Sequence, residues 1–152
     1  MNAVPAPHNA DAEESVVGAM LLPGSATVID VVARIVTAAD FFAPSLGLIF
    51  DACVALHTAG EPVDAITVTD RLEREGTLAD VGGTTRVHEL AALVPAFLNA
   101  GHYARIVRAK AVDRRHLAVL REQVARIEDG RRLDLDAVRK LLDEDEHAGT
   151  AA

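Results

Sequence analysis

The chain has 152 residues, half of them apolar, a formal net charge of −8 and a single cysteine, Cys53. This length and apolar content suffice for one sizeable core, and a lone cysteine excludes an intrachain disulfide. No apolar run approaches the ~20 residues of a membrane span, and the acidic beginning of the chain is unlike a signal peptide, so we expect a soluble, cytoplasmic protein that contacts no membrane. The negative charge argues against a chain that binds nucleic acid with its whole surface, because phosphates would be repelled.

Helical spacing of apolar residues runs through most of the chain, and the strict alternation that is typical of strands is nearly absent. We therefore predict an all-α fold, with a flexible lead at residues 1–8 and a small globular helical body at residues 9–98. Capping residues, prolines and glycines mark the expected boundaries. Helices are predicted to start at Asn9, Ser25, Ser45, Asp64 and Thr84 and to end at Pro23, Gly60, Gly76 and Pro95, with a capping box formed by Thr37 and Asp40.

Only five aromatic residues occur, and four of them occupy core-like positions in these patterns: Phe41, Phe42, Phe50 and Tyr103. Phe97 is the one that is predicted to lie in a loop. Base stacking on aromatic rings is the usual means of binding single-stranded nucleic acid. A stacking platform is therefore not expected here.

No catalytic, cofactor or metal site emerges from the sequence. Neither lysine follows a glycine, so the chain has no phosphate-binding loop of the Gly-Lys-Ser/Thr type. Cys53 and His57 share one helical face, but two ligands do not make a metal site, and cysteine is usually a core residue. The segment Gly82-Gly83-Thr84-Thr85 is interpreted as a turn with a cap rather than as an anion-binding site. We expect a protein that is not an enzyme and binds no cofactor.

A long helix is predicted from Asn99 to Asp129, followed by a stop at Gly130 and a second helix entered through Asp134 or Asp136. The two segments form a predicted helical hairpin over residues 99–146, with a tail at 147–152. The shorter second arm covers only part of the first, so apolar positions are left for another chain. The residues expected to carry this self-association are Ile106, Leu117, Leu120, Val124, Ile127, Leu135, Val138 and Leu142.

The long helix is also the basic part of the chain. Residues 99–132 hold nine of the 15 Lys and Arg and four of the 23 Asp and Glu, which is +5 against −13 elsewhere. A solvated helix face is the first interpretation. A direct nucleic-acid contact is the less favoured one, and it would use Arg105, Arg108, Arg114 and Arg115.

Several short motifs recur in order between about residues 7 and 142, and each of them is weak alone. They include Asp40-Phe41-Phe42, Leu48-Ile49-Phe50, Gly60-Glu61-Pro62-Val63-Asp64, Gly76-Thr77-Leu78, Gly82-Gly83 and Tyr103-Ala104-Arg105-Ile106-Val107. In their order and spacing, these motifs together resemble the N-terminal domain of DnaB-type replicative DNA helicases. Leu46-Gly47 departs from the family's polar pair at that place, which we interpret as a loss of polar surface groups that contact partners.

The resemblance implies a helical body with a hairpin through which such domains form dimers and then a ring, and it implies recruitment of a DnaG-type primase. We expect a non-catalytic module of this kind that acts in DNA replication. One alternative is an N-terminal fragment, or a separately encoded collar, of an ATP-dependent replicative helicase whose motor domain would follow the hairpin. A second alternative, from another class, is a DNA-binding protein that uses the basic helix.

Overall fold

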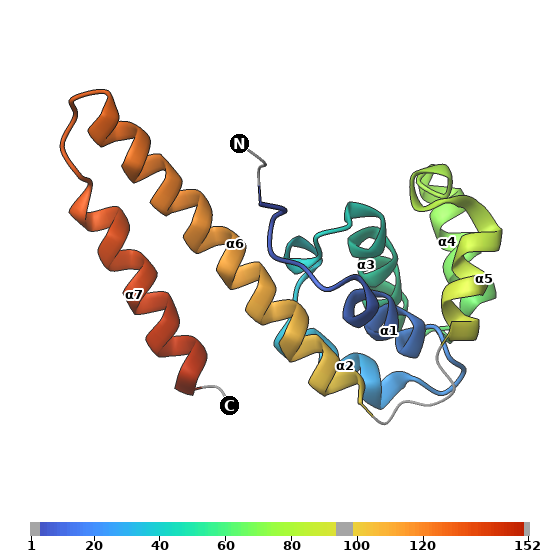
Figure 1. Ribbon diagram of the computed structural model, residues 1–152. Coiled ribbons are helices and arrows are strands. Elements are labelled where there is room, and N and C mark those ends of the chain that lie inside the picture. Colours follow the sequence, from blue (N-terminus) through green and yellow to red (C-terminus); the bar gives the residue numbers. More distant parts are fainter. Residues whose placement is uncertain (1–3, 94–98, 151–152) are drawn as a thin grey trace. The chain divides into compact units, whose positions relative to one another are not determined.

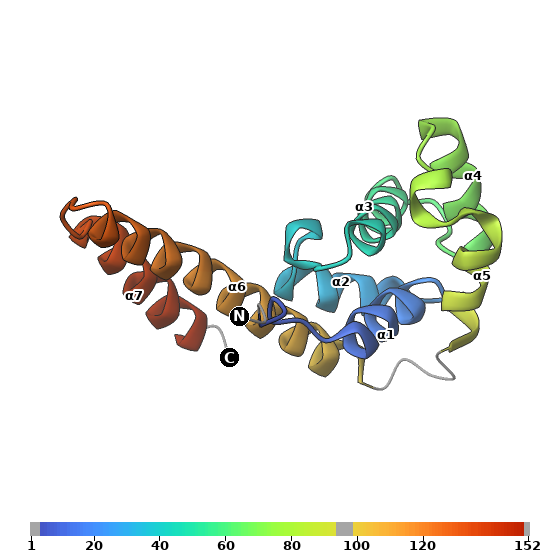
Figure 2. The same cartoon turned by 45° about the horizontal axis from the view of Figure 1, so that its top comes forward.

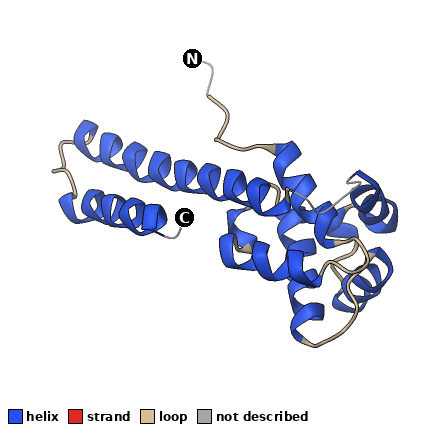
Figure 3. Cartoon of the chain, turned by 90° about the horizontal axis from the view of Figure 1, so that it is seen from below, coloured by secondary structure: helices blue, strands red, loops and turns tan. Residues whose placement is uncertain are grey.

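The computed structural model describes residues 4–93 and 99–150, with side chains as far as Glu144. The described residues form seven α-helices and two short 3-10 helices, and no strand occurs among them (Figure 3). This confirms the predicted all-α fold. The chain divides into two compact units: Pro7–Ala111, here called the core unit, and Val112–Ala152 with Met1–Ala6, here called the hairpin unit.

The core unit contains five complete helices and the first turns of a sixth (Figure 1). Helix α1 contacts α2, α3 and α5, and α3 also contacts α4. Residues 94–98, which include the predicted loop residue Phe97 and the predicted stop at Pro95, lie outside the described part. The helices of this unit are α1 (Ala10–Met20), α2 (Ala26–Ile35), α3 (Pro44–Thr58), α4 (Ala65–Glu75), α5 (Gly83–Leu93) and the start of α6 (Ala100–Glu128).

Local capping explains where several of these helices begin and end. Asn9 Oδ1 accepts the N–H of Ala12 at 2.9 Å, and Asp64 Oδ1 accepts the N–H of Ile66 and Thr67, both at 2.9 Å. Gly76 ends α4 with φ +74°, a conformation that costs glycine little. The predicted capping box is present, since the N–H of Thr37 donates to Asp40 Oδ2 at 2.8 Å.

Three predicted helix starts differ in detail from the structure. Ser45 is the second residue of α3, which begins at Pro44. Ser25 precedes α2, but its hydroxyl donates to the carbonyl of Met20 at 2.7 Å and so satisfies the end of α1 instead. Helix α5 already begins at Gly83, which places Thr84 inside the helix rather than at its cap.

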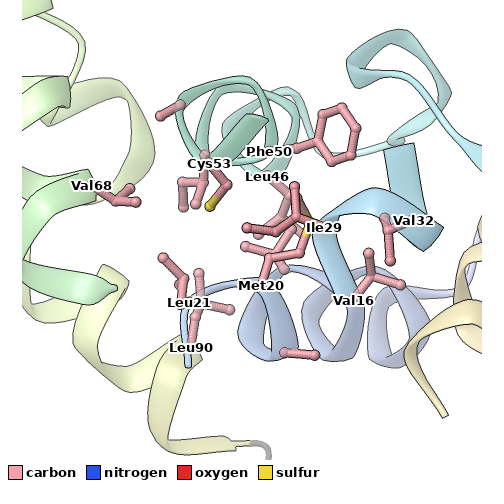
Figure 4. Close-up of a cluster of buried hydrophobic side chains, with 14 of the residues drawn as sticks. Val16, Met20, Leu21, Ile29, Val32, Leu46, Phe50, Cys53, Val68 and Leu90 are labelled. Atoms are coloured by element: carbon pink, nitrogen blue, oxygen red, sulfur yellow. The ribbon is translucent and has the colours of Figure 1, made fainter. Parts of the chain in front are cut away.

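Side chains from α1 to α5 meet in one hydrophobic core (Figure 4). The first turns of α6 complete it with Ala100, Ala104 and Val107, all buried. Many of the larger fully buried side chains recur at helical spacing, in agreement with the apolar periodicity of the sequence. They include Val16, Met20, Leu21, Ile29, Val32, Ile49, Leu56, Leu72 and Leu90.

Two expectations about surface and core were wrong. Phe42 is 44% exposed and stacks on His8, with ring centroids 4.2 Å apart, although its neighbour Phe41 is buried. The backbone is extended at Phe41, and in extended chain successive side chains point to opposite sides. Leu46 and Gly47 are both buried, so they replace no surface groups. A Cβ at Gly47 would lie 2.8 Å from the carbonyl oxygen of Ala38, which makes glycine necessary there.

The hairpin unit consists of the end of α6, a turn, and α7 (Leu135–Thr150). The two helices run antiparallel and side by side in both views (Figures 1 and 2). Helix α7 continues past Glu146, so the predicted tail is helical as far as Thr150. Gly130 has φ +74°, and the N–H of Arg131 donates to the carbonyl of Arg126 at 2.8 Å, which is the usual hydrogen-bonded end of a helix.

Candidate self-association surface

An apolar row lies exposed along the second half of α6. Leu117 is half-buried, whereas Leu120, Val124 and Ile127 are 48%, 55% and 57% exposed. Their spacings of three, four and three residues place them on one face of the helix. We call these four residues the association seam. Side chains of this size are rarely grouped on a surface that faces only water.

Helix α7 adds two further exposed apolar side chains to the hairpin unit. Leu135 is 58% exposed and Leu142 is 62% exposed, while Val138 is half-buried. Ile106, which the sequence grouped with these residues, lies instead in the core unit and packs against its hydrophobic core. The structure therefore brings together seven of the eight predicted association residues within the hairpin unit and leaves Ile106 apart.

A side of α6 other than the seam carries the buried Gln123. Gln123 is buried, and Val119 and Arg126 are half-buried. Gln123 Oε1 accepts the N–H of Asp134 at 2.8 Å, and Arg126 Nε donates to the carbonyl of Arg132 at 3.2 Å. Sequence reasoning missed Gln123 and Val119, although the valine lies at i−4 from the glutamine and the two share one face.

Asp134 is the residue that caps α7. Its Oδ1 accepts the N–H of Ala137 at 3.1 Å, and its carbonyl accepts the N–H of Val138 at 3.2 Å. Of the two predicted entry residues, Asp134 and Asp136, the first is the cap. The turn that joins the two arms is thus fixed by hydrogen bonds at both ends.

The four arginines considered for nucleic acid are placed differently from one another. Arg105 is exposed, and Arg114 and Arg115 are half-buried. Arg108 donates to both oxygens of the buried Asp40 carboxylate, at 3.0 and 3.2 Å. Arg108 therefore contributes to the packing of α6 in the core unit.

The described residues offer little to metal or nucleophilic chemistry. Within them no group of three or more His, Cys, Asp or Glu could hold a metal ion. Burial raises the pKa of the Cys53 thiol to about 12, which keeps it protonated and unreactive. His57 Nε2 lies within hydrogen-bond distance of Asp30 Oδ1 on α2, at 2.8 Å.

The glycine pair Gly82-Gly83 at the start of α5 also has a structural use. The N–H of Gly82 donates to the carbonyl of Ala79 at 3.2 Å, and that of Gly83 to the carbonyl of Leu78 at 2.9 Å. Both glycines have positive φ. These amides form the turn that the sequence predicted.

In the described part of the chain, none of the helices has the length and apolarity that crossing a bilayer would require.

Comparison with known proteins finds relatives of this chain in sequence and in structure. The family of DnaB-like helicase N-terminal domains matches residues 5–109. The replicative DNA helicase DnaB of Leifsonia xyli subsp. xyli is 47% identical over 109 residues, which cover 72% of this chain and 23% of that protein. The DnaB helicase of Mycobacterium leprae is 43% identical over 109 residues, 72% of this chain and 18% of that protein. The replicative DNA helicase DnaC of Bacillus subtilis is 35% identical over 140 residues, 92% of this chain and 30% of that protein.

Solved structures agree in fold. The crystal structure of the N-terminal domain of DnaB helicase from Mycobacterium tuberculosis has a TM-score of 0.79 at 34% identity and covers 94% of this chain and 99% of that one. A DnaB-like replicative helicase, described with its interactions with primase, has a TM-score of 0.64 at 18% identity over 92% of this chain and 31% of that one, which is a likeness of fold. The chain spans between 18% and 30% of the length of the curated relatives given above. It belongs to the family of DnaB-like helicase N-terminal domains.

Proposed function

We propose that this chain is a non-catalytic DnaB N-terminal-type module that self-associates through its hairpin and recruits a primase-type partner. The observation that carries the proposed self-association is the set of exposed apolar side chains on the two helices of the hairpin unit. Five side chains there are between 48% and 62% exposed: Leu120, Val124, Ile127, Leu135 and Leu142. A second copy of the chain would supply a complementary apolar face, since symmetric pairing brings the same patch from both subunits together.

The magnitude of this burial accounts for part of the free energy that a dimer needs. Two copies contribute twice five half-exposed apolar side chains, each of which gains roughly 1 kcal/mol on burial. That sum of roughly 10 kcal/mol falls within the ~4 to 15 kcal/mol that association costs in lost freedom of motion. Because a micromolar dissociation constant requires about 8 kcal/mol beyond that cost, we expect further contacts between the two copies to contribute to the dimer.

Light scattering during size-exclusion chromatography tests the self-association. The wild-type chain should elute as a dimer or a dimer-based ring, and Leu120→Asp combined with Val124→Asp should convert it to a monomer with unchanged helical content. Ile66→Asp is the matched control, because Ile66 is an exposed apolar residue of α4 in the core unit and is 71% exposed. A wild-type chain that stays monomeric at high micromolar concentration contradicts the proposal.

The second half of the proposal, partner recruitment, draws on the family. One related helicase of the same fold is described together with its interactions with primase. The segments outside residues 99–132 hold 19 acidic against six basic residues, which favours a partner with a basic face and a salt-sensitive contact. Calorimetric titration with the C-terminal helical domain of a DnaG-type primase, at two ionic strengths, is the test. Heat that diminishes with salt supports recruitment, and no heat at either ionic strength contradicts it.

A second candidate is the N-terminal part, or a separately encoded collar, of an ATP-dependent replicative helicase. It is favoured by the curated relatives, which are replicative DNA helicases much longer than the matched region. The DNA that follows the last codon distinguishes the two, because a continuing frame with a Gly-x-x-x-x-Gly-Lys-Ser/Thr loop would identify a helicase. In either case we expect this chain alone not to hydrolyse ATP.

A further inference from the structure

Gln123 is a buried polar side chain within the largely exposed hairpin unit, and it is only 4% exposed. Its Oε1 accepts the N–H of Asp134, and Asp134 in turn caps the first turn of α7 through Ala137. One side chain of α6 thus holds the residue from which α7 starts. Because a buried polar pair is favourable only in the arrangement that satisfies it, such a pair selects one packing of two helices over others.

The position of Gln123 relative to the association seam follows from helix geometry. Successive residues of an α-helix are offset by about 100°, so Ile127, Leu120 and Val124 lie about 40°, 60° and 100° around α6 from Gln123, all toward the same side. Val119 and Arg126, both half-buried, lie about 40° and 60° toward the other side. Leu117 lies about 120° toward the same side as the rest of the seam, so helix α7 starts beside Gln123, about 80° away from the middle of the seam.

In a different packing of the hairpin, α7 would cover the seam of its own chain. A roll of α7 around α6 by that angle would bring apolar side chains such as Leu135 and Leu142, now exposed, toward Leu120 and Val124. The hydrophobic effect favours such a roll. It would also separate Gln123 from Asp134 and leave the N–H of Asp134 without its acceptor.

We propose that Gln123 keeps the association seam open by holding α7 away from it. Gln123 is a positioning residue in this role, and it acts on a second copy of the chain only through α7. The inference rests on the proposed self-association. The inference adds a determinant of the self-association: the affinity of the dimer depends on a polar side chain that does not lie on the seam.

Gln123→Met tests this inference, because methionine has a similar length and no hydrogen-bond acceptor of comparable strength. The variant should keep its helical content while its dimer dissociation constant rises at least tenfold and the Asp134 amide exchanges its hydrogen at least tenfold faster. Glu122→Met is the matched control, since Glu122 is exposed on the neighbouring position of α6 and should change neither quantity. Gln123→Glu retains an acceptor oxygen and should retain the protection of the Asp134 amide.

The wild-type chain provides a test that needs no variant. Gln123 is the single glutamine of the sequence, so side-chain ¹⁵N labelling of glutamine gives one pair of amide signals. These signals should exchange slowly, and fast exchange would overturn the inference. A wild-type dimer whose affinity and Asp134 protection are unchanged by Gln123→Met contradicts this inference alone. A wild-type chain that never dimerises contradicts the proposed function, and the inference with it.

Discussion

Arg108 on α6 and Asp40 at the end of a short 3-10 helix (Ala38–Asp40) form an ion pair in which both carboxylate oxygens accept from one guanidinium nitrogen, at 3.0 and 3.2 Å. The Asp40 side chain is 2% exposed, whereas that of Arg108 is 42% exposed. The carboxylate also accepts the N–H of Thr37. The pair therefore joins the start of the long helix to a turn 68 residues earlier in the chain.

Removing the arginine should destabilise the core unit. Arg108→Met leaves a buried carboxylate with fewer donors, and because the arginine is partly exposed to water we expect a loss of about 1 to 2 kcal/mol of unfolding free energy. Arg105→Met is the control, since Arg105 is exposed on the same helix and should change stability by less than about 0.5 kcal/mol. Urea denaturation measures the unfolding free energy of both variants. Equal losses in the two variants would show that the ion pair with Asp40 has no special weight.

Glu13 should be a second determinant of stability. It is 1% exposed, and its two carboxylate oxygens accept the N–H of Phe42 at 2.7 Å and of Ala43 at 3.2 Å. Ala43 is the N-cap of α3 and has no side chain that could cap it. Glu13 of α1 thus satisfies amides at the beginning of another helix.

Glu13→Ala should lower the unfolding free energy by roughly 2 to 4 kcal/mol, because two amides lose their acceptor. Glu13→Gln should lower the unfolding free energy by less, since one acceptor oxygen remains. Asp11→Ala changes an exposed acid of the same first turn and should cost about 0.5 kcal/mol. Chemical denaturation compares the three variants, and a Glu13→Ala protein as stable as the Asp11→Ala protein would contradict the capping role.

Cys53 should make the unfolding free energy decrease at alkaline pH. Its thiol pKa is raised from 9.0 to about 12 by burial in the folded chain. Unfolding above pH 9 therefore releases a proton, and stability is lost as pH rises from 9 toward 12, by about 1.4 kcal/mol per pH unit from this group. The difference between the wild type and Cys53→Ala isolates the effect, because other groups titrate equally in both. A constant difference from pH 8 to 11 would contradict it.

Local signals made the elements of this fold predictable. The caps at Asn9 and Asp64 and the stop at Gly76 depend on residues within one turn, so sequence spacing alone places them. The buried stripes follow from periodicity in the same way. The hairpin was predictable too, since Gly130 and Asp134 mark its turn.

The roles of Glu13 and Gln123 depend on residues far along the chain or across the hairpin. Glu13 has the position of an ordinary acid in a first helical turn, and only the approach of Phe42, 29 residues away, makes it a buried cap. Gln123 stands among charged residues of a basic helix, and its burial depends on where α7 starts. The sequence places Leu46 at the surface, whereas the structure buries it. Its burial comes from neighbouring helices that the local sequence does not identify.

The basic helix provides the last prediction, which concerns DNA. Of its arginines, Arg108 is already paired with Asp40, and Arg114 and Arg115 are half-buried. A phosphate-binding surface needs several accessible cations, and the net charge of −8 opposes the approach of a duplex. We therefore expect no electrophoretic shift of duplex DNA at 50 to 200 mM salt. A shift that weakens steeply with salt and is abolished by Arg105→Gln together with Arg114→Gln and Arg115→Gln would instead establish the helix as a DNA-binding surface.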